Sequence, residues 1–139
     1  MNAHELMAKA VRATASAKIL LDTGDVDGAC DRAYYAMFNA ARAALLASSA
    51  PVQADISRTH SGLIAAFSLH LVKPGQVSVD LGRALNKVEE LRLIADYKGD
   101  PIDLEQAAWA VEMSRIFVLS MQAQFIPVKD EEGNPNPSQ

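Results

Sequence analysis

The sequence predicts an all-α fold, an antiparallel up-and-down bundle of four or five helices. Apolar residues recur at the i, i+3/i+4, i+7 spacing of a buried helical stripe in five successive segments. Short stretches rich in polar residues, Gly or Pro separate the segments, and short connections favour antiparallel neighbours. No strand-like alternation extends beyond a few residues, and we find no internal repeat.

Residues 30–46 are predicted to form the central helix. Asp31, Arg32, Asn39 and Arg42 leave only a narrow polar edge. A helix that is apolar around most of its circumference packs against other helices on several sides. Its buried stripe is predicted to contain Cys30, Ala33, Tyr34, Met37, Ala41, Ala44, Leu45 and Ser48, widened by Tyr35, Phe38, Ala40 and Leu46. Free cysteine is commonly buried, so we expect Cys30 to be a small core residue.

Short capping signals bound the first two helices. Residues 3–22 form the first, and Gly24 is expected to end it because glycine readily adopts the left-handed conformation. Asp25 or Asp27 is expected to cap the second helix. Pro51 closes that helix, since the residue before proline is disfavoured in helical geometry.

Similar signals place the remaining helices. The third begins near Ser57 or Thr59 and ends at Lys73, before Pro-Gly. Ser78 is expected to cap the fourth helix and Asp103 the fifth. The apolar stripe of the fifth helix is predicted at Leu104, Ala107, Ala108, Val111, Val118, Met121 and Phe125.

The chain is predicted to have one domain, residues 1–126, followed by a disordered acidic and proline-rich tail, residues 127–139. No apolar run approaches the roughly 18 residues of a membrane span, and the first residues lack the pattern of a secretory signal. One cysteine cannot form an internal disulfide, so we expect a cytoplasmic protein. A net charge of −4 argues against a protein that holds nucleic acid mainly through its overall field, but not against a small local basic site. We expect no DNA partner.

Arg92 interrupts the apolar seam of the fourth helix. Leu81, Leu85 and Val88 step with heptad spacing, and four more residues reach Arg92, where leucine would be expected. A guanidinium at the margin of such a stripe needs an anion or carbonyl groups, because an unpaired buried charge is costly. Asp96 lies one turn further on and can pair with Arg92. A salt bridge at the edge of a packing seam is the simplest account.

His60, Tyr34 and Tyr35 are the other candidate polar side chains. His60 near the start of the third helix is either a capping residue or a general base or phosphate contact. The tyrosines are expected in the core, and one of their hydroxyls can reach Arg92, Asp96 or His60. The three histidines of the chain show no metal-ligand spacing, and no cofactor motif is present. We therefore expect neither a metal nor a cofactor.

Three segments together resemble the HEPN (higher eukaryotes and prokaryotes nucleotide-binding) domain family. Residues 32–42, Arg-Ala-Tyr-Tyr-Ala-Met-Phe-Asn-Ala-Ala-Arg, resemble its central-helix signature. Residues 58–63, Arg-Thr-His-Ser-Gly-Leu, resemble its third-helix segment, and residues 91–97, Leu-Arg-Leu-Ile-Ala-Asp-Tyr, its Arg-x-x-x-Asp-Tyr segment. The segments occur in family order, and the resemblance covers residues 3 to about 126.

The resemblance implies a helical bundle that dimerises through the face carrying the motif arginine. It also implies a metal-independent endoribonuclease, in several members a toxin paired with a nucleotidyltransferase antitoxin. Arg92 fits the arginine of the family's catalytic Arg-x(4–6)-His signature, but Tyr97 stands where the histidine would be. A tyrosine, with an unperturbed pKa near 10, is a poor base at neutral pH, and His60 is a candidate for a substitute base.

Three functions remain open at this point. The first is an RNA-cleaving toxin whose cleft carries Arg92, Asp96 and Tyr97, with His60 as a further candidate and Tyr34 and Tyr35 as support. The second is a non-catalytic homodimeric module that binds a nucleotide, RNA or a nucleotidyltransferase partner. The third is a structural dimer in which Arg92 and Asp96 form an interface salt bridge.

Overall fold

The computed structural model describes residues 1–52, 58–98 and 101–127, except for the side chains of Tyr97 and Lys98, and these ranges contain helices and no strand. The helices are α1 (Ala3–Asp22), α2 (Val26–Ala47), α3 (His60–Phe67), α4 (Val79–Leu93) and α5 (Leu104–Phe125). The π-helical segments η2 (Ser68–Val72) and η3 (Ile94–Lys98) continue α3 and α4. The predicted all-α bundle is confirmed. The predicted tail lies, from residue 128 on, outside the described residues.

Side-chain caps fix where the helices begin. The side chains of Asp25, Thr59, Ser78 and Asp103 each accept a hydrogen bond from a backbone N–H in the first turn of the helix that follows. Each cap therefore satisfies one of the orphan donors that a helix start leaves. Gly24 has φ of +87°, as predicted for the residue that ends the first helix.

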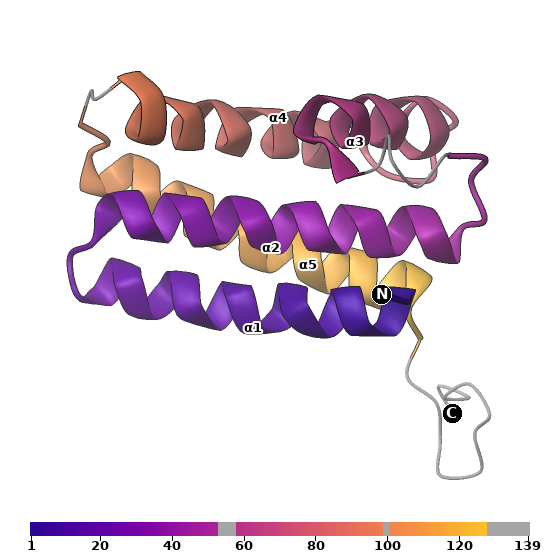
Figure 1. Cartoon of the computed structure of the whole chain (residues 1–139), viewed down its shortest axis with the longest axis horizontal. Coiled ribbons are helices and arrows are strands. Elements are labelled where there is room, and N and C mark those ends of the chain that lie inside the picture. Colours follow the sequence, from indigo (N-terminus) through magenta and orange to yellow (C-terminus); the bar gives the residue numbers. More distant parts are fainter. Residues whose placement is uncertain (53–57, 99–100, 128–139) are drawn as a thin grey trace, which may run out of the picture.

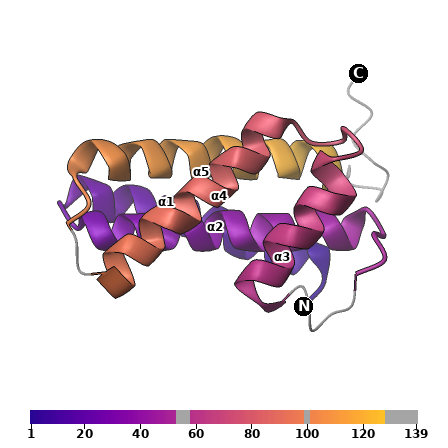
Figure 2. The same cartoon turned by 90° about the horizontal axis from the view of Figure 1, so that it is seen from above.

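Helix α2 lies at the centre of the bundle (Figure 1). It runs antiparallel to α1 on one side, while α3 and α4 cover the opposite side and α5 packs against both α1 and α2. The view from above shows α3 and α4 lying obliquely across α2 (Figure 2). None of the helices in the described ranges has the length and apolarity that a bilayer-spanning segment needs.

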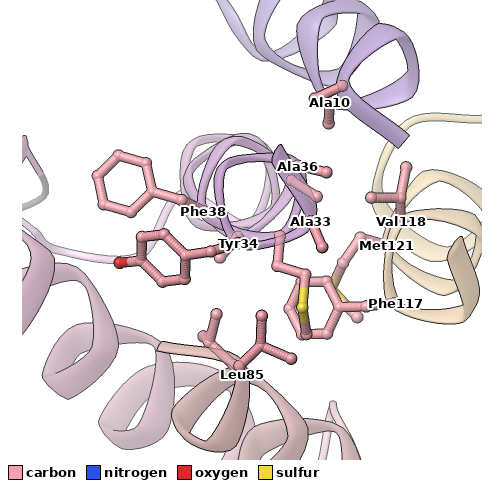
Figure 3. Packing of buried hydrophobic residues seen from close by; sticks show 14 of the residues in the cluster. Ala10, Ala33, Tyr34, Ala36, Phe38, Leu85, Phe117, Val118 and Met121 are labelled. Carbon is pink, nitrogen blue, oxygen red and sulfur yellow. The ribbon is translucent and has the colours of Figure 1, made fainter. Parts of the chain in front are cut away.

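Small residues allow α1 and α2 to approach closely. Ala10 of α1 and Ala33 and Ala36 of α2 are fully buried. Figure 3 shows α2 nearly end-on, with Ala36 directed toward α1 and the larger Phe117 and Met121 of α5 filling the space on another side. In the same view Tyr34 and Phe38 extend away from α1 and α5. The aromatic end of α2 therefore faces the region between α3 and α4.

Near the ends of α2 and α5, some residues that the helical spacing places on a buried stripe are exposed. Leu46, near the C-terminus of α2, is 53% exposed, and Leu104, the first residue of α5, is 61% exposed. Ala108 is exposed as well. These three predictions of burial are wrong because periodicity locates a face of a helix, whereas burial also needs a neighbour along the whole of that face. The π-helical geometry of η2 and η3 was likewise not expected from a regular 3.6-residue period.

Candidate active site

Arg92 lies in the last turn of α4 and is only 5% exposed, so the structure buries it more deeply than a residue at the margin of a seam. Its guanidinium carbon is 4.8 Å from the ring centroid of Tyr34 and 5.7 Å from that of Tyr35. A guanidinium over an aromatic face is attracted by the negative face of the ring. The two tyrosines of α2 therefore form a wall against which the cation rests.

The predicted pair between Arg92 and Asp96 is confirmed. Nη1 of Arg92 donates to a carboxylate oxygen of Asp96 over 3.3 Å. The Asp96 side chain is 35% exposed and belongs to η3, so it marks the side of the site that opens to solvent. The Nε–H of Arg92 is buried, and no described residue accepts a hydrogen bond from it. The buried guanidinium thus keeps donor capacity that Asp96 does not use.

The hydroxyl of Tyr34 contacts two further polar side chains, His60 and Glu89. The Tyr34 hydroxyl is 2.8 Å from Nδ1 of His60 and 3.2 Å from Oε2 of Glu89. A phenol carries one proton, which it donates to the Glu89 carboxylate. The short contact with the imidazole then requires a proton on Nδ1, so His60 donates to the Tyr34 oxygen. In a neutral imidazole this tautomer leaves Nε2 with the free lone pair.

Aromatic packing holds the His60 ring. Its centroid lies 5.3 Å from Tyr34, 5.8 Å from Tyr35 and 5.1 Å from Phe38. All three rings project from one face of α2, while Thr59 caps α3 immediately before His60. Arg92 and His60 contact the same Tyr34 ring, at 4.8 Å and 5.3 Å from its centroid, so their separation cannot exceed the sum of these two distances. The start of α3 and the end of α4 thus meet on α2.

Burial keeps two nearby acids protonated. Desolvation raises the pKa of Tyr34 well above its usual value, and the charge and hydrogen bond of Glu89 add to this rise, against the opposing effect of Arg92. Desolvation, followed by the charges of Asp27 and Asp96, raises the pKa of Cys30 to about 11. Cys30 is fully buried, as predicted, and is a neutral thiol at physiological pH.

The structure brings together five of the six predicted site residues: Arg92, Asp96, His60, Tyr34 and Tyr35. The backbone of Tyr97 is part of η3, but its side chain lies outside what the structure describes. Sequence reasoning missed Glu89. Glu89 lies three residues before Arg92 and therefore on the same side of α4, and this spacing could have predicted that it belongs to the site.

The described side chains include no group of three or more His, Cys, Asp or Glu residues arranged to hold a metal ion. The described site offers a guanidinium, an imidazole, phenol groups and two carboxylates. Such a set can bind an oxyanion, orient a hydroxyl group and move a proton.

Comparison with known proteins finds a matching domain family and several similar proteins. The HEPN domain family matches residues 3–123. A protein of Gloeobacter violaceus named UPF0332 protein glr0978 is 39% identical over 68% of this chain and 71% of its own length. A UPF0332 protein of Thermotoga maritima is 37% identical over 65% of this chain and 64% of its own length. A Methanocaldococcus jannaschii protein named "Putative toxin MJ0605" is 34% identical over 74% of this chain and 73% of its own length.

The family match extends over all five helices, and the relatives carry names of two kinds, "UPF0332 protein" and "Putative toxin". On this evidence the chain belongs to the HEPN domain family.

Proposed function

We propose that this chain is a metal-independent endoribonuclease and the toxin of a toxin–antitoxin pair. The observation that carries the proposal is the shared contact with Tyr34, which holds a buried guanidinium and an oriented imidazole against one aromatic side chain. One nucleotide can contact both groups. The toxin-like names of relatives from Methanocaldococcus jannaschii support the biological role.

The proposed reaction is an intramolecular transesterification of RNA. The ribose 2′-oxygen attacks the adjacent phosphorus, the bond from phosphorus to the 5′-oxygen breaks, and the leaving oxygen takes up a proton. The products are a 2′,3′-cyclic phosphate and a 5′-hydroxyl. The reaction needs a base for the 2′-hydroxyl, stabilisation of the phosphorane and an acid for the leaving group.

Each task has a candidate in the site. Nε2 of His60 carries the lone pair that removes the 2′-hydroxyl proton, while Tyr34 and Glu89 fix the orientation of the ring. The guanidinium of Arg92 is our candidate for the group that binds the non-bridging phosphate oxygens, and Asp96 holds it in place. Tyr97 follows Asp96 in the motif position and is our candidate for the acid, because a phenol donates a proton more readily than it removes one at neutral pH.

We also place the active form as a homodimer that is silenced by a nucleotidyltransferase antitoxin. Asp96 marks the open side of the site, so a second copy or a partner that covers this side would exclude water from the Arg92–Asp96 pair. Exclusion of water strengthens the attraction between Arg92 and a phosphate.

The test is cleavage of a fluorescent single-stranded RNA in excess EDTA, with product ends identified by mass spectrometry. We expect cyclic-phosphate products from the wild type and a loss of at least about 100-fold in Arg92→Ala and in His60→Ala. Arg12→Ala, an equal charge change on an exposed position of α1, is the matched control. Cleavage that persists in both site variants would overturn the assignment.

The biological role has its own test. Expression of the wild type should arrest growth of a bacterial host, and Arg92→Ala should not. Co-expression with a nucleotidyltransferase encoded beside the gene should restore growth. Growth arrest by Arg92→Ala at equal protein level would contradict the toxin role, whatever the cleavage assay shows.

A non-catalytic module that binds RNA or a nucleotide is the second candidate function. The replacement of the motif histidine by Tyr97 favours it, because the imidazole in that position of the signature is absent from this chain. This alternative predicts affinity that depends on Arg92 with no turnover of a cleavable RNA.

A further inference from the structure

We propose that Arg42 and Arg58 form a second anion-binding subsite, which holds a backbone phosphate of single-stranded RNA next to the His60–Arg92 site. The nature of the ligand rests on the proposed function, whereas the existence of the subsite rests on charge and geometry away from Arg92. Arg42 lies in the last third of α2, and Arg58 precedes the Thr59 cap of α3.

The two arginines line the same cavity. It has a volume of about 160 Å³, and its wall also contains the apolar side chains of Leu45, Leu46 and Val52. Arg42 is half-buried and Arg58 is exposed, so one guanidinium forms part of the wall and the other stands at the rim. The apolar wall lowers the local dielectric, and this strengthens the attraction of the two cations for an anion.

The positive charge of this cavity is not neutralised within the described part of the chain. Burial, and next the charge of Arg58, lower the pKa of Arg42, which means that the two cations are close enough to repel each other. The Nε–H of Arg42 is buried and has no acceptor among the described residues. Arg32, by contrast, is paired with Asp31. A phosphate bound at this cavity would supply the opposite charge to the two guanidinium groups.

Phe38 connects this cavity with the candidate active site. The guanidinium carbon of Arg42 is 6.0 Å from the Phe38 centroid, and the His60 ring is 5.1 Å from the same centroid. Arg42 and His60 therefore both contact the Phe38 ring, so a single aromatic side chain links them. A chain of nucleotides that places one phosphate near Arg92 and His60 can place a neighbouring phosphate near Arg42.

The face of α2 that carries Phe38 and Arg42 continues toward the N-terminus of the helix. Arg32, Tyr35, Phe38 and Arg42 follow one another at spacings of three, three and four residues, which puts them on one face. At 1.5 Å per residue the face is about 15 Å long. Arg42 lies at one end and Arg32, which is paired with Asp31, at the other, where the half-buried Tyr35 ring is 5.3 Å from the guanidinium carbon of Arg32. Cations that follow a backbone beside an aromatic surface are typical of single-strand binding.

The test measures binding of two RNAs with 2′-O-methyl groups, which the proposed reaction cannot cleave. One has ten nucleotides and the other has two. Fluorescence anisotropy is recorded across a salt series for the wild type, Arg58→Gln, Arg42→Gln and the control Arg12→Gln. Thermal unfolding of each variant shows whether it is folded, and Arg58 is an exposed residue whose replacement leaves the core untouched.

We expect Arg58→Gln to lower the slope of log K against log salt by about 0.7 for the ten-nucleotide RNA, the value for one phosphate contact with a single strand. This corresponds to about fivefold weaker binding at about 0.1 M salt. Affinity for the dinucleotide should be unchanged, and Arg12→Gln should match the wild type with both RNAs. An unchanged slope in both Arg58→Gln and Arg42→Gln overturns the subsite.

The outcomes also separate the subsite from the proposed function. Binding of the long RNA that depends on Arg58, without cleavage of unmodified RNA, supports the subsite and overturns the nuclease. Cleavage that depends on Arg92, with no effect of Arg58 or Arg42 on binding of the long RNA, does the reverse. A wild type that neither binds nor cleaves RNA overturns both.

Discussion

The hydroxyl of Tyr34 lies 2.8 Å from Nδ1 of His60, and the ring of the same tyrosine carries the guanidinium of Arg92. One side chain of the central helix thus organises two polar groups that come from different helices. The hydroxyl sets the tautomer of the imidazole, and the ring face offsets part of the cost of burying the cation.

Tyr34→Phe should separate the two roles of Tyr34. The phenyl ring keeps the contact with Arg92 and the packing of the core, while the loss of the hydroxyl frees His60 from Glu89. If His60 is the base, we expect RNA cleavage to fall by about 10- to 100-fold, less than in His60→Ala, because only the orientation of the base is lost.

Glu89→Gln should weaken the same chain of hydrogen bonds and lower the rate of cleavage, because a neutral amide oxygen is a weaker acceptor of the Tyr34 proton than a carboxylate. The measurement is single-turnover cleavage of RNA by the wild type and both variants. Equal rates for the wild type, Glu89→Gln and Tyr34→Phe would show that the Tyr34–Glu89 chain does not position the base.

Asp96→Asn should destabilise the fold more than Arg92→Met does. Removing the Asp96 charge leaves a buried guanidinium without its counterion. We expect a loss of about 1–2 kcal/mol, below the roughly 3–5 kcal/mol of a fully buried pair because the Asp96 side chain is 35% exposed. Arg92→Met removes the charge and keeps an unbranched side chain against the tyrosines, so its stability should lie within about 1 kcal/mol of the wild type or above it.

Urea unfolding followed by circular dichroism measures both free energies of unfolding. If Arg92→Met proves less stable than Asp96→Asn, the guanidinium stabilises the fold through contacts other than its pairing with Asp96, and the expected order of the two variants is wrong.

Ala36→Leu should destabilise the protein by about 1–3 kcal/mol or more, because added methylenes strain a close-packed core. Ala36 is fully buried and faces α1, where small side chains allow close approach of the two helices (Figure 3). Ala123→Leu, at an exposed position of α5, adds the same atoms and should change the free energy of unfolding by no more than about 0.5 kcal/mol. Equal effects of the two changes in urea unfolding would contradict the close approach.

The Cys30 thiol should make the folded protein less stable at alkaline pH. Its pKa is about 11 in the folded protein and near 9.0 in the unfolded chain, so between these values the unfolded state loses its proton first. Stability from this group is therefore complete below pH 9.0 and falls as the pH rises toward 11, by up to about 1.4 kcal/mol per pH unit. Cys30→Ala should show a shallower decline across this range. Parallel curves for the two proteins would show that the thiol titrates alike in both states.

The elements of the bundle could be predicted because their determinants are local. Asp25, Thr59, Ser78 and Asp103 cap the helices that follow them, and capping depends on a few adjacent residues. The burial of Cys30, Tyr34 and Met37 follows from the period of α2. The pairing of Arg92 with Asp96 also follows from spacing along one helix.

Burial at the helix ends could not be derived in the same way. Leu46 and Leu104 lie on the predicted stripes and are exposed, because the period does not say how far a neighbouring helix extends. The π-helical η3 changes the angle between successive residues after Leu93, so ideal helical geometry does not describe the relation of Arg92 to Tyr97.

Periodicity, caps and motifs are written along the chain, and they suffice to predict a helical bundle, the helix at its centre and the family that it resembles. The deep burial of Arg92, the contact of Glu89 with Tyr34 and the cavity shared by Arg42 and Arg58 depend instead on how the helices pack. Glu89 and Tyr34 are 55 residues apart, and no local spacing encodes such a contact. It exists because α4 packs on α2, and that packing minimises the free energy of the whole core rather than of any one segment.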